Sequence, residues 1–343
     1  MTCYNEKMKK NIYAPQPLIL TEGYFCDKQY HGYEMMSESI NNWKQLCPYQ
    51  LRPDGLSGRH QILQLHSMQI VYGQRKGGTM HNIGSAEECL TIGVVEVCAD
   101  KACIGNIKLQ AGDILFFDDS HPHNFITNDA IQFIIVTIPK SSLGSRRSKL
   151  SKALDQCIKD TDARFAITLR EIWKRFTESS DEKKNRQRYK DAEEEILKVI
   201  MKLLSEQTPG KAKLTDGEKT ALEIRDQVFH HMDGNISISS LAKQYKVSEQ
   251  TLQNSFKSLF GFTPKLFLRL LKLNIVRQEL QKNDPEQNTV SKVALKWGFR
   301  HMGRFSAYYA DLFGEKPSQT LKNAQAEEKG LTEACVSRQE EIE

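Results

Sequence analysis

The chain has 343 residues, a formal net charge of +5, and hydrophobic side chains at 39% of its positions. This length allows two domains with separate cores. No apolar run approaches the roughly 20 residues of a membrane span, and the polar, Lys-punctuated start does not resemble a signal peptide. The eight Cys are scattered without a zinc-type spacing. We therefore expect a cytoplasmic protein with reduced thiols and no membrane association.

The positive charge is concentrated in the C-terminal third. Residues 211–325 contain 18 Lys/Arg and 11 Asp/Glu, a balance of +7, whereas residues 326–343 contain two against six, a balance of −4. This leaves +2 for residues 1–210. A basic domain is what contact with phosphates requires, although solvated Lys faces are common in proteins of any function.

The N-terminal part changes character near Gln61. Residues 1–58 are rich in Pro and Gly and predict irregular structure, to which we assign no function. Residues 61–139 alternate in hydrophobicity between Gly-rich turns, which predicts five or six short strands of a small antiparallel barrel or sandwich. In the first of these stretches, alternation places Ile62 on one face with Ile70, and Leu63 on the other with Val71.

Residues 149–206 have the apolar periodicity of helices. One predicted stripe runs through Leu150, Leu154, Cys157 and Ile158. These helices either pair two subunits or pack within the chain. Residues 207–219 combine Pro, Gly and Lys without apolar periodicity and predict a linker between domains.

A sequence repeat follows the linker. Residues 236–268 and 289–321 each predict a short helix, a turn and a second helix that ends at Gly and Pro. Phe256, Phe260, Gly261 and Pro264 precede Tyr309, Phe313, Gly314 and Pro317 by 53 positions each. An internal repeat with aromatics, Gly and Pro in register indicates two copies of one structural unit. A helix from about Lys265 to Lys282 joins them.

The two units resemble the DNA-binding domain of the AraC/XylS family of bacterial transcription regulators. The matching positions are Leu241, Ala242, Ser248, Leu252, Phe256, Lys257, Phe260, Gly261 and Pro264 in the first unit, and Ala294, Gly298, Phe299, Phe305, Tyr309, Phe313, Gly314 and Pro317 in the second. The WGF and GEKPSQTL segments are similar to a subgroup that includes ethanolamine-utilisation regulators. The resemblance implies promoter DNA and RNA polymerase as partners, a homodimer, and an activator rather than a repressor.

The strand-rich part is similar to the cupin-like sensor domain that many members of this family carry. Ala111 to Phe117 followed by His121-Pro122-His123 resembles the second cupin motif. A barrel of this size holds one small ligand, and the predicted effector wall comprises Met68, Ile70, Tyr72, Ile92, Val94, Phe116 and His123. The alternative for the apolar members is plain core packing. A regulator that needs no ligand and is controlled by a protein partner or by its abundance is the alternative function.

The histidines also raise the question of a metal site. His121 and His123 would share a face of a strand, which permits metal binding but is common by accident. The first cupin motif, an H-x-H with a Glu, is missing, because the GGTMHNIG segment offers only His81 and no H-x-H precedes it. We therefore expect no metal, no other cofactor, no catalytic residue and no enzyme activity.

The two predicted recognition helices differ in chemistry. Ser248 is the expected N-cap of the first, and Gln and Asn side chains suit adenine edges, whereas Lys and Arg suit phosphates or guanine. The second helix lacks the usual Ser or Thr cap and has short outer side chains, so shape and backbone contacts are expected to dominate there. The predicted DNA-binding residues are Ser248, Gln250, Gln253, Asn254, Lys257, Arg300, His301, Met302, Arg304 and Ser306.

The sequence thus predicts a multidomain α+β chain in which an antiparallel β-barrel with helices precedes an all-α domain. The expected boundaries are a sensor domain at 1–145, a helical dimerisation or packing segment at 146–206, a linker at 207–219, a DNA-binding domain at 220–325 and an acidic, disordered tail at 326–343. If both recognition helices enter successive major-groove faces, they should lie about one turn of DNA, roughly 34 Å, apart.

Overall fold

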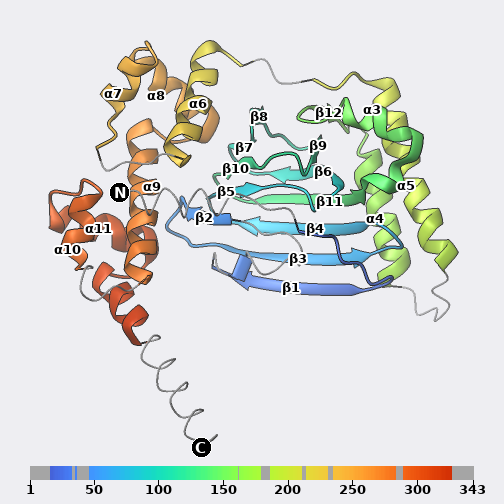
Figure 1. Ribbon diagram of the computed structural model, residues 1–343, viewed down its shortest axis with the longest axis horizontal. Coiled ribbons are helices and arrows are strands. Elements are labelled where there is room, and N and C mark those ends of the chain that lie inside the picture. Colours follow the sequence, from blue (N-terminus) through green and yellow to red (C-terminus); the bar gives the residue numbers. More distant parts are fainter. Residues whose placement is uncertain are drawn as a thin grey trace, which may run out of the picture.

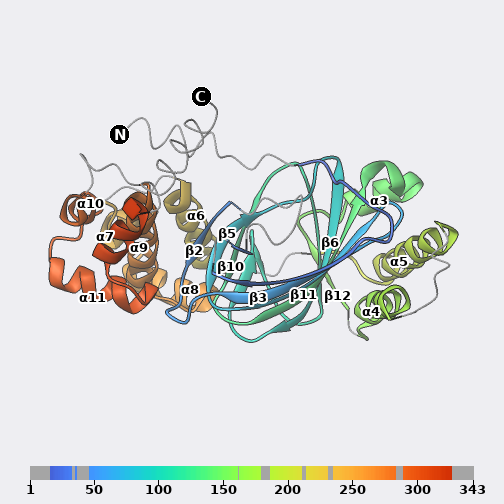
Figure 2. The ribbon, with the colours of Figure 1, turned by 90° about the horizontal axis from the view of Figure 1, so that it is seen from below.

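The computed structural model has an N-terminal part of two antiparallel sheets and a helical C-terminal domain (Figures 1 and 2). No helix among the described residues is long and apolar enough to cross a bilayer. The structure describes residues 16–32, 35–36, 46–160, 162–178, 186–210, 214–230, 235–282 and 289–326.

The larger sheet has seven strands in the order β1-β3-β4-β11-β6-β9-β12. All of its neighbouring strands are antiparallel. Its strands are β1 Phe25–His31, β3 Ser57–Gln64, β4 Gln69–Lys76, β6 Cys89–Cys98, β9 Asp113–Asp118, β11 Ile131–Pro139 and β12 Cys157–Lys159.

The smaller sheet has five strands in the order β2-β5-β10-β7-β8 and is also antiparallel. Its strands are β2 Leu46–Gln50, β5 Thr79–Ile83, β7 Ala102–Ile104, β8 Ile107–Lys108 and β10 His123–Thr127. An apolar core joins the two sheets, with Val71, Leu115 and Phe117 from the larger one and Ile104 and Phe125 from the smaller one. The two sheets therefore face each other, as the alternation of the sequence predicted for an antiparallel domain.

Helices cover the other face of the larger sheet. Leu169 and Ile196 share an apolar core with Ile92, Phe116 and other residues of that face. Figure 2 shows α4 and α5 beside the larger sheet, on the side away from the C-terminal domain. The helical elements are the 3-10 helix η1 Lys140–Arg146, α3 Arg147–Ser151, α4 Arg164–Thr177 and α5 Arg186–Glu206.

The structure corrects the predicted stripe of residues 150–158. Leu150 is buried in helix α3, but Cys157 and Ile158 lie in strand β12, opposite Leu115 and Ile114 of β9. Pairing with the edge strand β9 gives hydrogen-bond partners to backbone N–H and C=O groups that a short isolated helix would leave without one. Apolar spacing alone does not distinguish a short buried strand from a helix turn.

The hairpin of β3 and β4 corrects a second detail. Leu63 lies opposite Ile70, and Ile62 lies opposite Val71. Cross-strand partners point to the same face, so Ile62 faces the smaller sheet with Val71 and not the helices with Ile70. The prediction assumed that inward and outward side chains keep alternating without interruption from β3 through the turn into β4. The chain reverses at this turn, and the register of the hairpin decides which residues of β4 share a face with those of β3.

The C-terminal domain contains the two predicted units. The first has α7 and α8, the second has α10 and α11, and α9 lies between them (Figure 1). Both second helices have 12 residues, and both end at a left-handed Gly, Gly261 with φ 72° and Gly314 with φ 70°. The helices are α6 Asp216–His230, α7 Ile238–Gln244, α8 Glu249–Phe260, α9 Pro264–Gln281, α10 Val290–Lys296 and α11 Met302–Phe313.

The buried residues of the units occupy equivalent positions. Leu252, Phe256 and Leu259 of α8 and Phe305, Tyr309 and Leu312 of α11 are all at most 2% exposed. Equal spacing on two amphipathic helices of one length gives the same buried face in each.

The expected domain boundaries shift at two places. Helix α6 begins at Asp216, inside the predicted linker of residues 207–219, and strand β12 lies inside the predicted helical segment. The joining helix α9 begins at Pro264, a favourable first position because its missing N–H has no helical partner. Residues 327–343, most of the predicted tail, are outside the described residues.

Candidate nucleic-acid interface

The first recognition helix, α8, begins at the predicted cap. The Ser248 hydroxyl accepts a hydrogen bond of 3.0 Å from the backbone N–H of Thr251, satisfying a donor that the helix start leaves open. The four other predicted residues of this unit are exposed, on the side opposite the buried Leu252 and Phe256: Gln250, Gln253, Asn254 and Lys257. Gln250 Nε2 donates to Asn254 Oδ1 at 3.0 Å, so these two amides are already aligned along the outer face.

The second recognition helix, α11, has the expected poorer cap. His301 takes the N-cap position without a side-chain hydrogen bond. Arg300, His301 and Arg304 are exposed, and Met302 and Ser306 are half-buried. The exposed end of this unit is therefore cationic and offers few amide groups, which suits phosphate contact better than base readout.

A groove of about 590 Å³ separates the two units. Its walls come from the start of α7, from α9 and from the segment that leads into α11. Five cationic side chains line it: Lys265, Arg269, Lys272, Arg300 and Arg304. Arg269 lies over the ring of Tyr308, with its guanidinium carbon 4.1 Å from the ring centre. Stacking of this kind holds a guanidinium in place while its edge stays free to donate.

Sequence reasoning missed the three groove cations of α9. Lys265, Arg269 and Lys272 follow a spacing of four and three, which puts them on one stripe of a helix. That signal was present in the sequence. We treated α9 as a spacer, and only the packing of both units around it shows that this stripe faces a groove.

Comparisons with known proteins agree with this geometry. The family described as "Helix-turn-helix domain" matches residues 241–323. The "XylDLEGF operon transcriptional activator" of Pseudomonas putida is 38% identical over 102 residues, which are 29% of this chain and 31% of that protein. The "Probable thc operon regulatory protein" of Rhodococcus erythropolis is 32% identical over 97 residues, 28% of this chain and 29% of that protein. The matches thus span about three tenths of these relatives.

Two solved structures align with more of the chain. The AraC-like transcriptional activator CuxR is 11% identical with a TM-score of 0.41, covering 76% of this chain and 96% of that one. ToxT from Vibrio cholerae is 13% identical with a TM-score of 0.29, covering 74% and 97%.

The C-terminal region is thus a DNA-binding domain of two helix-turn-helix units joined by one helix. In this domain the chain is similar to regulators of the AraC/XylS type, as its repeat predicted.

The smaller sheet of the N-terminal part packs against this domain. Tyr49, Met80 and Ile126 lie on its outer face and join the apolar core of α6, α8 and α9. The contact continues with polar groups, since the backbone N–H of Gln50 donates to Asn274 Oδ1 at 2.7 Å and Asn274 Nδ2 donates to the Gln50 carbonyl at 2.8 Å. The side-chain amide of Asn274 therefore pairs with both backbone groups of Gln50, as the backbone of a neighbouring strand would.

The same residue also reaches the second unit. The side-chain Nε2 of Gln50 donates to the backbone carbonyl of Leu312, in α11, at 2.6 Å. One strand residue is therefore hydrogen-bonded to the joining helix and to the second recognition helix. The N-terminal part therefore contacts the second unit as well as the joining helix.

An ion pair fixes the first unit to the same sheet. Glu218 of α6 accepts from Lys108 of β8 and from the Ser258 hydroxyl of α8, the latter at 2.7 Å. Burial by itself raises the pKa of Glu218, but these hydrogen bonds and one from the Thr215 N–H lower the pKa to about 2. The carboxylate is therefore charged at neutral pH and joins three elements.

The structure places the predicted effector residues in two different environments. Six of them belong to the core between the larger sheet and its helices: Met68, Ile70, Tyr72, Ile92, Val94 and Phe116. They do share one face, as alternation predicted, and helices fill the space in front of that face. Side chains of adjacent residues in a strand point to opposite faces, and sequence alone does not say which face the helices cover.

His123 is the exception. It lies outside that core and borders a cavity of about 290 Å³, together with Phe116, Phe117, Asn124, Arg225 and Asp226. Arg225 and Asp226 belong to α6, so both the N-terminal part and the DNA-binding domain contribute to this wall. Asn124 Nδ2 donates to Asp226 Oδ1 across the boundary.

Proposed function

We propose that the chain is a transcription regulator that binds double-stranded promoter DNA in a sequence-specific manner. The observation that best supports this function is the pair of helix-turn-helix units. They expose polar recognition faces beside a groove that five cationic side chains line. Gln253 and Asn254 would contact base edges, while Arg269, Arg300 and Arg304 would contact phosphates. The relative named as an operon transcriptional activator supports activation as the mode.

A DNA-selection experiment tests this function. The full chain would be used to enrich sequences from a random duplex pool, and the selected duplex compared with a shuffled one by fluorescence anisotropy. We expect a preference for the selected duplex that persists as salt is raised, because phosphate contacts weaken with salt on both duplexes while base contacts distinguish them. Equal affinity for both duplexes at low and moderate salt would contradict the proposal.

We further propose that the 290 Å³ cavity receives the effector, instead of the sheet face that the sequence suggested. Its volume lies just below the range of about 300–1,000 Å³ for small-molecule sites. A ligand there would contact β10 and α6 at once. It would thereby change how the DNA-binding domain docks on the N-terminal part. A ligand that binds one docked arrangement more tightly than another shifts the balance between them, and regulation requires such a shift.

Melting of the full chain against a metabolite panel tests the effector proposal. A ligand at 100 times its dissociation constant adds about 2.7 kcal/mol to the unfolding free energy, and Asn124→Leu should abolish that shift. A hit that also changes DNA affinity supports ligand control. The absence of any hit would favour the ligand-independent regulator. Homodimerisation and contact with RNA polymerase are further proposals that rest on the family.

A further inference from the structure

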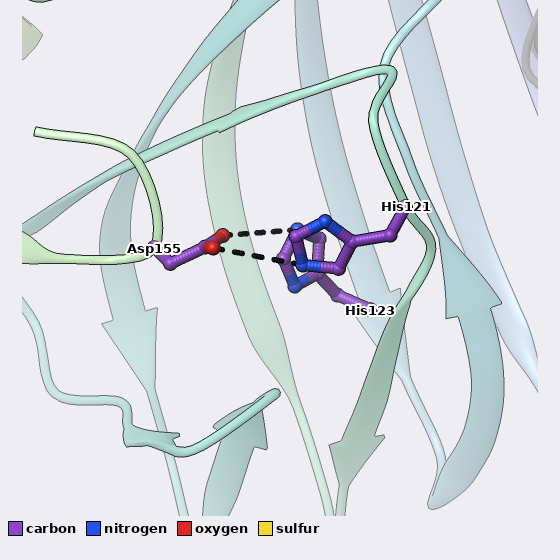
Figure 3. A group of neighbouring side chains, drawn as sticks. All are labelled: His121, His123 and Asp155. Atoms are coloured by element: carbon purple, nitrogen blue, oxygen red, sulfur yellow. Dashed lines mark ion pairs between the residues drawn. The ribbon is translucent and has the colours of Figure 1, made fainter. Parts of the chain in front are cut away.

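Three potential metal ligands converge at the mouth of this cavity. His121 and His123 come from the segment between β9 and β10 and from the start of β10, and Asp155 comes from the turn before β12. Figure 3 shows the Asp155 carboxylate directed at both imidazole rings. His121 Nε2 lies 3.6 Å from Asp155 Oδ2, and His123 Nε2 lies 3.4 Å from Asp155 Oδ1.

These separations suit a shared cation better than direct hydrogen bonds. An N–H···O hydrogen bond places its heavy atoms about 2.7–3.2 Å apart, so both pairs are wide. Zinc binds His nitrogen and carboxylate oxygen at about 2.0–2.2 Å in a tetrahedron, which places neighbouring ligand atoms roughly 3.3–3.6 Å apart. All three ligand atoms lie within 4.8 Å of one another. Small side-chain rotations would therefore complete the geometry.

Contacts around the cluster hold its members in position. The Ser120 hydroxyl lies 2.9 Å from His121 Nδ1, the nitrogen that does not face Asp155. Such a partner fixes the ring and leaves Nε2 available as a ligand. The backbone of Asp155 is left-handed, with φ 57°, and its N–H donates to the Phe116 carbonyl at 2.9 Å. An unusual backbone conformation in a non-Gly residue, anchored in this way, is typical of functional positions.

The charges near the cluster are compatible with a cation. Arg225, which lines the same cavity, is 2.8 Å from Asp226 and donates to the Gly105 carbonyl at 2.7 Å. Its positive charge is therefore largely offset. His121 has half of its side chain exposed, so an ion has a route from solvent.

We propose that His121, His123 and Asp155 bind one divalent transition-metal ion of the zinc class, with its fourth position open to the cavity. Two imidazoles and a carboxylate suit zinc, nickel or iron better than magnesium or calcium, which prefer oxygen. The sequence argued against a metal because two His alone are a weak signal. Folding adds the third ligand from 32 positions beyond His123. This inference goes beyond the regulation proposed above and does not depend on DNA binding.

Zinc titration of the full, reduced chain tests the site. Isothermal calorimetry should show tight binding of one equivalent of zinc. His121→Ala and Asp155→Asn should each weaken the zinc affinity by at least about tenfold, because even residues that only hydrogen-bond to metal ligands change metal affinity by about that much. His31→Ala removes an exposed His of β1 and should leave the affinity unchanged. Because His121 and Asp155 are partly exposed, both variants should fold, which circular dichroism checks.

Cobalt provides a second measurement that separates this site from the cysteines. Cobalt bound by nitrogen and oxygen should give tetrahedral visible bands without the intense near-ultraviolet absorption of cobalt–thiolate bonds. Equal zinc affinity in all three variants and the original chain, no stoichiometric binding, or a thiolate spectrum would each overturn the proposal.

Discussion

The two-way hydrogen bond between strand β2 and helix α9 gives a test of how the N-terminal part holds the DNA-binding domain. Asn274→Ala removes the acceptor of the Gln50 N–H and the donor to the Gln50 carbonyl, and Asn274 is only 5% exposed. A buried donor left without a partner costs about 1–3 kcal/mol. Ala is the better helix former by up to about 0.7 kcal/mol. We therefore expect a net loss of about 0.3–2.3 kcal/mol.

Urea unfolding measures this loss. Trp173 lies in α4 and Trp297 directly follows α10, so tryptophan fluorescence reports on both parts of the chain, and circular dichroism follows helix loss. The matched control is Gln281→Ala, at the exposed end of the same helix. We expect Asn274→Ala to lower the midpoint and Gln281→Ala to leave it nearly unchanged. If the two variants unfold at the same urea concentration, the contact does not stabilise the docked arrangement.

Three further predictions concern base readout, phosphate contact and pH. Gln253→Ala should cost about 1–3 kcal/mol at one base step of the selected duplex; anisotropy with single-base variants checks this, and equal losses at every step would contradict it. Arg269→Ala should weaken binding to all duplexes and reduce the salt slope by about 0.9, whereas exposed Lys202→Ala on α5 should not; an unchanged slope for Arg269→Ala would argue against a phosphate contact. Burial, aided by the charge of Arg75, lowers the pKa of His60 from 6.5 to about 3. The unfolded chain then binds more protons below pH 6.5, so the unfolding free energy should fall as pH drops from 6.5 toward 3. His60→Gln should flatten that dependence, and an unaltered slope in urea melts across this range would refute the assignment.

The sequence alone was sufficient for the two helix-turn-helix units because the information that defines them is local. Gly261 and Gly314 end equivalent helices, and Ser248 caps α8 through a bond three residues away. Caps, helix periodicity and the 53-residue register need no knowledge of distant contacts. The exposed face of α8 follows directly, since burying Leu252 and Phe256 leaves Gln253 and Asn254 outside.

Sequence alternation was less informative for the sheets. It showed that Ile70, Ile92 and Phe116 share a face, because side chains alternate along each strand. It did not show whether helices or the second sheet cover that face, since both coverings bury the same residue types. The hairpin partner of Ile62 was likewise set by the register of β3 and β4.

Only the tertiary structure decided where the two parts meet. Gln50 and Asn274 are separated by 224 positions, and neither has a neighbour in sequence that marks it as a contact. His121, His123 and Asp155 come together because β12 pairs with β9 and brings its preceding turn to the start of β10. Local patterns determine helices, caps and turns, whereas the partners of a side chain across elements depend on how the chain packs as a whole.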